Sequence, residues 1–114
     1  MAKRGRVWKI RVVKPYAEAH NHVIIGDVLE ETPTWIRVRG RTYHFGKTVQ
    51  RIQDIKVGAK SVRIIPWSRV EVIHELPGSF EWDRGALVAD GKGNIALKQG
   101  DSVCPIVSEW KVAK

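Results

Sequence analysis

Apolar and polar residues alternate near the start of the chain. In residues 6–13, RVWKIRVV, the apolar side chains of Trp8, Ile10 and Val12 are separated by basic ones. Successive side chains of a strand point to opposite faces of a sheet, so this alternation predicts a half-buried β-strand. Pro15 follows and marks the end of the strand.

Two longer strands are expected at residues 22–31 and 35–46, with a turn at ETPT between them. Each strand contains one glycine within an otherwise strand-like pattern, Gly26 in the first and Gly40 in the second. Glycine inside a strand is typical of a bend or a bulge. Both strands are therefore expected to be strongly bent.

The middle of the chain has a weaker pattern. Val49, Ile52 and Ile55 recur at every third position of residues 47–58, which predicts one or two helical turns or an ordered loop. Two short apolar strands are then expected at residues 61–65 and 70–76.

Only four residues, PWSR, join these two short strands. A simple reversal of the chain commonly uses Asn-Gly or Asp-Gly. The large ring of Trp67 and the cation of Arg69 therefore suggest a further role for this corner. Two interpretations are open: Trp67 plugs the open end of a barrel, or it faces a ligand together with Arg69.

The last third of the chain predicts a hairpin over residues 86–99, with a glycine-rich turn at 90–94. A final strand is expected to lie at a sheet edge, because Pro105 has no backbone N–H to donate. Strands predominate throughout and strong helical periods are lacking. The chain is thus expected to be all-β, and its short, bent strands predict a small barrel.

The charge is unevenly distributed over the 114 residues, which carry a formal net charge of +8. Residues 1–14 contain six Lys or Arg and no acid, and residues 34–69 contain nine Lys or Arg and one acid. Such basic blocks are typical of a polyanion site, although a basic solvated face is the simpler explanation. The single cysteine, Cys104, and the absence of an apolar signal segment or membrane-length run favour a cytoplasmic protein.

Residues 5–77 resemble the Sm-like family, which includes the eukaryotic Sm proteins, their archaeal versions and bacterial Hfq. The resemblance lies in HNHVIIGDVLEETPTWIRVRG, which is similar to that family's bent strand pair, and in IIPWSRVEVI, which is similar to its strand, one-turn corner and last strand. It implies a strongly bent, SH3-like barrel over residues 1–78, with a basic N-terminal tail. Residues 79–114 would form a C-terminal β extension.

The resemblance also implies a homo-oligomeric ring, a hexamer or heptamer, in which strands 61–65 and 70–76 pair with neighbouring subunits. It further implies a single-stranded RNA ligand. The family's base-reading residues have no counterpart here: no Asn matches in the ETPT turn, and Pro66 and Trp67 stand where Arg-Gly or Tyr-Lys-His is expected. Binding with little sequence preference is therefore expected.

Candidate nucleic-acid-binding residues combine cations for phosphates with aromatic rings on which bases can stack. The alternative is a solvated strand face whose arginine stems cover apolar surface. The candidates are Arg37, Arg39, Arg41, Tyr43, His44, Trp67 and Arg69, together with Lys3, Arg4 and Arg6 of the N-terminal tail.

No catalytic constellation, cofactor motif or metal-ligand spacing is recognised, so the protein is not expected to be an enzyme. His20 and His22 form an H-x-H pair, but a metal site needs three or four ligands. Two functions stay open: an RNA-binding Sm-like ring, and a structural or interaction scaffold with no nucleic-acid role. Salt dependence distinguishes them, because phosphate binding weakens steeply as the salt concentration rises.

Overall fold

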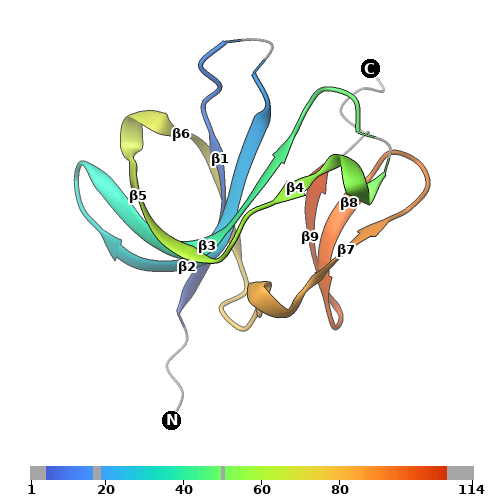
Figure 1. Cartoon of the computed structure of the whole chain (residues 1–114). Coiled ribbons are helices and arrows are strands. Elements are labelled where there is room, and N and C mark those ends of the chain that lie inside the picture. Colours follow the sequence, from blue (N-terminus) through green and yellow to red (C-terminus); the bar gives the residue numbers. More distant parts are fainter. Residues whose placement is uncertain (1–4, 17–18, 50, 108–114) are drawn as a thin grey trace.

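The computed structural model describes residues 5–16, 19–49 and 51–107, and this part of the chain is all-β (Figure 1). The strands are joined by short turns and single turns of 3₁₀ helix. The strands are β1 (Arg6–Val12), β2 (Asn21–Glu31), β3 (Trp35–Phe45), β4 (Lys56–Val57), β5 (Ser61–Pro66), β6 (Val70–Leu76), β7 (Ala86–Ala89), β8 (Ile95–Gln99) and β9 (Ser102–Val107), and the 3₁₀ turns are η1 (Ile52–Asp54), η2 (Trp67–Arg69) and η3 (Trp82–Arg84).

The first six strands form one antiparallel sheet in the order β4-β3-β2-β1-β6, in which β5 also pairs with β3. β5 pairs with the first part of β3, residues 35–40, and β4 pairs with Tyr43 and His44 near its end. The sheet curls, but among the described residues β5 and β6 do not pair with each other. The expected all-β class is confirmed, and the sheet is strongly curled, but over the described ranges it does not close into a barrel.

Alternation along the strands gives the curled sheet an apolar inner face. Trp8, Ile10 and Val12 of β1 lie on this face, as the sequence predicted. They pack against buried side chains from β2, β3 and β5, which are Ile24, Ile36, Val38 and Ile65. The corner residue Trp67 and the β6 residues Val70 and Ile73 pack at the margin of this inner core.

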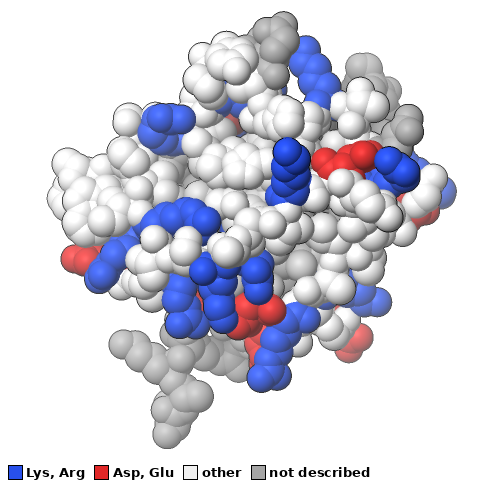
Figure 2. Space-filling model, in the orientation of Figure 1, with Lys and Arg blue, Asp and Glu red and all other residues white. Residues whose placement is uncertain are grey.

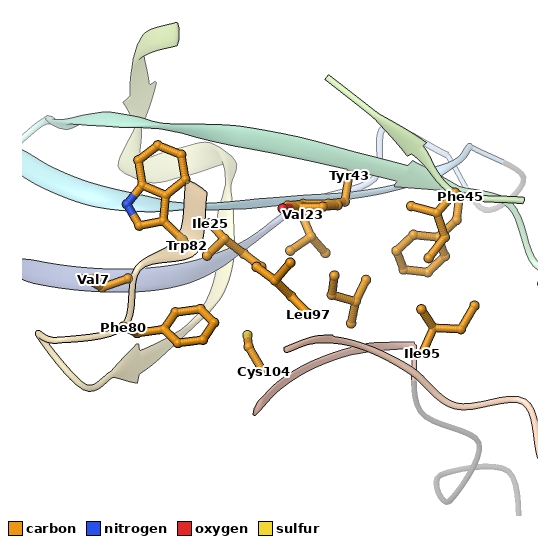
Figure 3. Packing of buried hydrophobic residues seen from close by; sticks show 12 residues of the cluster. Val7, Val23, Ile25, Tyr43, Phe45, Phe80, Trp82, Ile95, Leu97 and Cys104 are labelled. Atoms are coloured by element: carbon orange, nitrogen blue, oxygen red, sulfur yellow. The ribbon is translucent and has the colours of Figure 1, made fainter. Parts of the chain in front are cut away.

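The opposite, outer face of the same sheet is covered at one end by the three-stranded antiparallel sheet β7-β8-β9 (Figures 1 and 3). The six-stranded sheet contributes Val7, Val23, Ile25, Tyr43 and Phe45 to this second core. The C-terminal segment contributes Phe80, Trp82, Ile95, Leu97, Cys104 and Ile106. The predicted extension is thus packed on the first sheet, and β9 is an edge strand with Pro105 in it.

The predicted strands are all present, but the segment between β3 and β5 differs in detail. The 3₁₀ turn η1 spans three residues, and its N-cap is Arg51. The Asp54 carboxylate accepts a hydrogen bond from the Arg51 backbone N–H at 3.0 Å. The two-residue strand β4 that follows was not predicted, because two residues are too few to show a period.

Gly26 and Gly40 face each other across β2 and β3. A Cβ atom at Gly26 would lie 2.5 Å from the Gly40 Cα atom and would also collide with the Arg39 carbonyl oxygen. Carbon atoms that are not bonded prefer separations of about 3.5–4.0 Å. The two backbones therefore approach each other here more closely than any side chain allows.

Gly26→Ala should lower the free energy of unfolding by about 3 kcal/mol, because the backbones of β2 and β3 must separate to admit the methyl group. Urea denaturation measures this. Gly5→Ala is the control, since a Cβ atom at Gly5 has nothing within 4 Å. Equal stability of the two variants would show that the strands separate without cost.

Candidate nucleic-acid interface

Three arginines lie in a row along β3. Arg37, Arg39 and Arg41 alternate with the buried Ile36 and Val38, which places the arginines on the outer face of the sheet. The three-stranded sheet covers this face only from Tyr43 onward. Lys and Arg side chains gather in the lower middle of the molecule, with carboxylates between them (Figure 2). The three arginines form one row because they share one face of β3.

The three arginines differ in their partners. Arg37 donates to the Glu30 carboxylate at 2.9 Å, and Arg41 donates to the Gly58 carbonyl oxygen at 3.3 Å. Arg39 is exposed and lies directly opposite Asp27 in the β2–β3 register. Acidic residues of β2 thus partly offset the row, and Arg39 is the member best placed to meet a phosphate.

The two aromatic candidates are less available than expected. Tyr43 is only 2% exposed and belongs to the core between the two sheets, so its ring has no open face for a base. Trp67 is half-buried: its Nε1–H donates to the Thr32 carbonyl oxygen at 2.7 Å, and its ring lies 6.5 Å from that of Trp8. The structural interpretation of Trp67 is the one these contacts favour, because it fills the end of the curled sheet.

The remaining cationic candidates lie away from the arginine row. Arg6 forms an ion pair with Glu31 at 2.6 Å and stacks over Trp8, with its guanidinium carbon 5.1 Å from the ring centre. Arg69 is exposed at the corner, where its carbonyl oxygen accepts a hydrogen bond from the Val13 N–H at 2.8 Å. Lys3 and Arg4 lie outside the described residues.

His44 lies on the opposite side of the sheet from the arginine row and stacks on His22, with ring centres 4.1 Å apart. Burial is the main cause that lowers the pKa of His22 to about 4, and the neighbouring groups His44, Arg63 and Arg69 lower it further. The pKa of His44 is also lowered, mainly by burial. Both imidazoles are therefore neutral at pH 7 and contribute no charge to a phosphate site.

Sequence reasoning treated His22 as half of an H-x-H pair, whereas its partner is across the strands. Gly26 pairs with Gly40, and His22 and His44 each lie four residues farther from the turn. The equal spacing of the two histidines from the two glycines was the sequence signal that could have predicted their contact. Among the described residues, no group of three or more His, Cys, Asp or Glu is arranged to hold a metal ion.

The two edges of the curled sheet carry exposed apolar side chains. Val62 and Ile64 of β5 are 52% and 60% exposed, and Val72 of β6 is 39% exposed. Cross-strand pairing with Arg39 and Arg37 places the two β5 residues on the outer face. Each of these edges lacks a partner strand within the described part of the chain.

No protein-family model, curated protein or solved structure matches this chain. In the described ranges, no helix has the length and apolar character needed to cross a membrane.

Proposed function

We propose that this chain is an Sm-like module that binds single-stranded RNA as a homo-oligomeric ring. The observation that carries the proposal is the pair of open edges: β5 and β6 end the curled sheet, a single 3₁₀ turn joins them, and both expose apolar side chains. An unpaired, apolar strand edge is a liability for a monomer, so an assembly that covers both edges is favoured.

The Sm-like assignment is supported by the order of the strands. A meander of β1, β2 and β3 with close-packed glycines is flanked by β5 on one side and β6 on the other. The one-turn corner at Trp67–Arg69 then carries the chain from one edge to the other. This arrangement supports the proposed assignment, with the C-terminal sheet as an addition.

A ring follows if β5 of one subunit pairs with β6 of the next. The contact is head-to-tail, so repeating it generates a closed ring when the rotation between subunits is suitable. On the outer face, Val62 and Ile64 would then lie beside Val72 of the neighbouring subunit, because all three side chains occupy that face. The pairing would bury the apolar groups that a single chain exposes.

RNA is the proposed ligand because the ring would repeat the exposed Arg39 around one assembly. A repeated field of this kind attracts a phosphate backbone without reading its bases. Little sequence preference is expected from the arginine row itself, since guanidinium–phosphate contacts carry no sequence information.

Arg39→Ala should weaken binding of single-stranded RNA about threefold to tenfold near 0.1 M salt and should reduce the slope of log K against log salt by about 0.7 per lost phosphate contact. Fluorescence anisotropy with a labelled oligonucleotide at several salt concentrations measures both. Lys92→Ala is the control of equal charge, because Lys92 is exposed in the β7–β8 turn. Equal effects of the two changes would mean that net charge, and not the arginine row, attracts RNA.

A scaffold with no nucleic-acid role is the second candidate. Ion pairing of Arg37 with Glu30, and the position of Asp27 opposite Arg39, favour it because they reduce the positive field of the row. An assembled protein with no measurable RNA affinity even at low salt would select this alternative.

A further inference from the structure

A cleft of about 350 Å³ lies between the outer face of the six-stranded sheet and the C-terminal sheet. Its apolar walls include Trp82, Leu87 and Leu97, and its polar groups come from Arg41, Tyr43 and Asp83. Apolar walls with a few convergent polar groups are the usual composition of small-ligand sites. The cleft is therefore a candidate ligand site, and it borders the arginine row at Arg41.

Tyr43 lines the cleft and supplies it with a hydroxyl group. The residue as a whole is 2% exposed, but its hydroxyl is not among the fully buried polar atoms that lack a partner in the described part of the chain, so the hydroxyl is open to a ligand in the cleft. In Figure 3 the hydroxyl lies at the end of the ring that points toward Trp82. Burial is the main cause that raises the pKa of Tyr43 to about 12, so the group is a protonated donor at neutral pH.

The two charged groups of the cleft have opposite signs. Arg41 presents hydrogen-bond donors, and its Nη1 makes only a long bond of 3.3 Å to the Gly58 carbonyl oxygen. Asp83 presents acceptors, with its Oδ2 held 3.6 Å from the Lys60 ammonium group. A simple anion would be repelled by Asp83 and a simple cation by Arg41. The matching ligand carries acceptors on one edge and donors on another.

We propose that the cleft binds a guanine base presented by single-stranded RNA, an inference that rests on the proposed function. Guanine offers the acceptors O6 and N7 on one edge, which suit Arg41 and Tyr43. Its N1–H and N2–H₂ groups donate on the adjacent edge, which suits the Asp83 carboxylate. The flat ring fits against the apolar walls. Adenine has a donor, N6–H₂, beside N7 and an acceptor at N1, so it would leave both charged groups mismatched.

The test is a titration of the full-length protein with guanosine 5′-monophosphate and, in parallel, adenosine 5′-monophosphate, followed by amide chemical shifts. We expect the guanosine nucleotide to shift resonances around Tyr43 and Leu97 and to bind at least tenfold more tightly than the adenosine nucleotide.

Tyr43→Phe should weaken guanosine nucleotide binding about fivefold, the usual effect of one neutral hydrogen bond. Because the hydroxyl has no partner among the described residues, thermal unfolding should be unchanged. Tyr16→Phe is the matched control, since Tyr16 is exposed and does not line the cleft; it should bind like the wild type.

Three results would overturn the guanine site: no shift at millimolar nucleotide, equal affinity for the two nucleotides, or unchanged affinity in Tyr43→Phe. If RNA binding that depends on Arg39 persists in any of these cases, the proposed function stands and only the base site is rejected. If RNA binding is absent while the guanosine nucleotide binds as expected, the cleft is a site for a free mononucleotide. The proposal that RNA presents the guanine base is then rejected.

Discussion

Removal of residues 79–114 should leave the remaining chain unfolded or aggregated at room temperature. The deletion strips one side from the core between the two sheets and exposes Val7, Val23, Ile25, Tyr43 and Phe45 to water. Full burial of each such side chain stabilises a fold by about 1.5–3 kcal/mol. The total loss is comparable with the whole stability of a small domain, about 5–15 kcal/mol.

Circular dichroism and size-exclusion chromatography of the truncated chain measure this outcome. A milder test is Leu97→Ala in the full chain, which should cost about 2–5 kcal/mol because Leu97 is 2% exposed in that core. Val103→Ala is its control and should change stability by no more than about 0.5 kcal/mol, since Val103 is 54% exposed. A truncated chain that stays soluble and melts like the full protein would show that the extension is an independent tail.

The positions of β1 and β3 could be predicted well because both strands have an alternating pattern. The inward set of β1 and the outward arginines of β3 follow from a period of two alone. Gly26 and Gly40 lie opposite each other, where the backbones of β2 and β3 approach closely, and Gly40 keeps the period of two of β3. These signals are local, so they can be recognised in the sequence without knowledge of the rest of the fold.

The environment of Tyr43 could not be predicted in the same way. Alternation places it on the outer face with Arg37, Arg39 and Arg41, and nothing nearby in the sequence distinguishes it from them. It is buried because β8, about fifty residues later in the chain, brings Leu97 against this end of the face. The inter-sheet cleft depends on the same long-range packing and had no local signal.

A local sequence pattern also could not predict that the sheet is open. Whether β5 and β6 pair with each other depends on how far the sheet curls, and the curl is set by packing inside it. At the corner, a single 3₁₀ turn, Trp67–Arg69, follows Pro66. Trp67 fills the end of the sheet, which is one of the two interpretations that the sequence left open.

Ile64→Lys should convert the proposed ring into monomers. The wild type should have a mass in solution that is a multiple of 12.9 kDa, and the variant should have the mass of one chain. Ile64 is 60% exposed on β5, so a lysine is well tolerated in the monomer. In the ring it would lie beside apolar β6 residues of the neighbouring subunit, where an unpaired charge costs several kcal/mol. That cost corresponds to a more than hundredfold loss in association at each interface.

Light scattering coupled to chromatography measures the mass, and Val103→Lys is the matched control because Val103 is similarly exposed on another edge strand, β9.

The same pair of variants separates assembly from RNA binding. The Ile64→Lys monomer keeps its Arg39 but loses the simultaneous contacts of several subunits, so its RNA affinity should fall at least tenfold, whereas Val103→Lys should bind like the wild type. A wild type that is monomeric at micromolar concentration would remove the ring. If Ile64→Lys dissociated the assembly without any loss of RNA affinity, the ring would stand, but each subunit would bind RNA on its own.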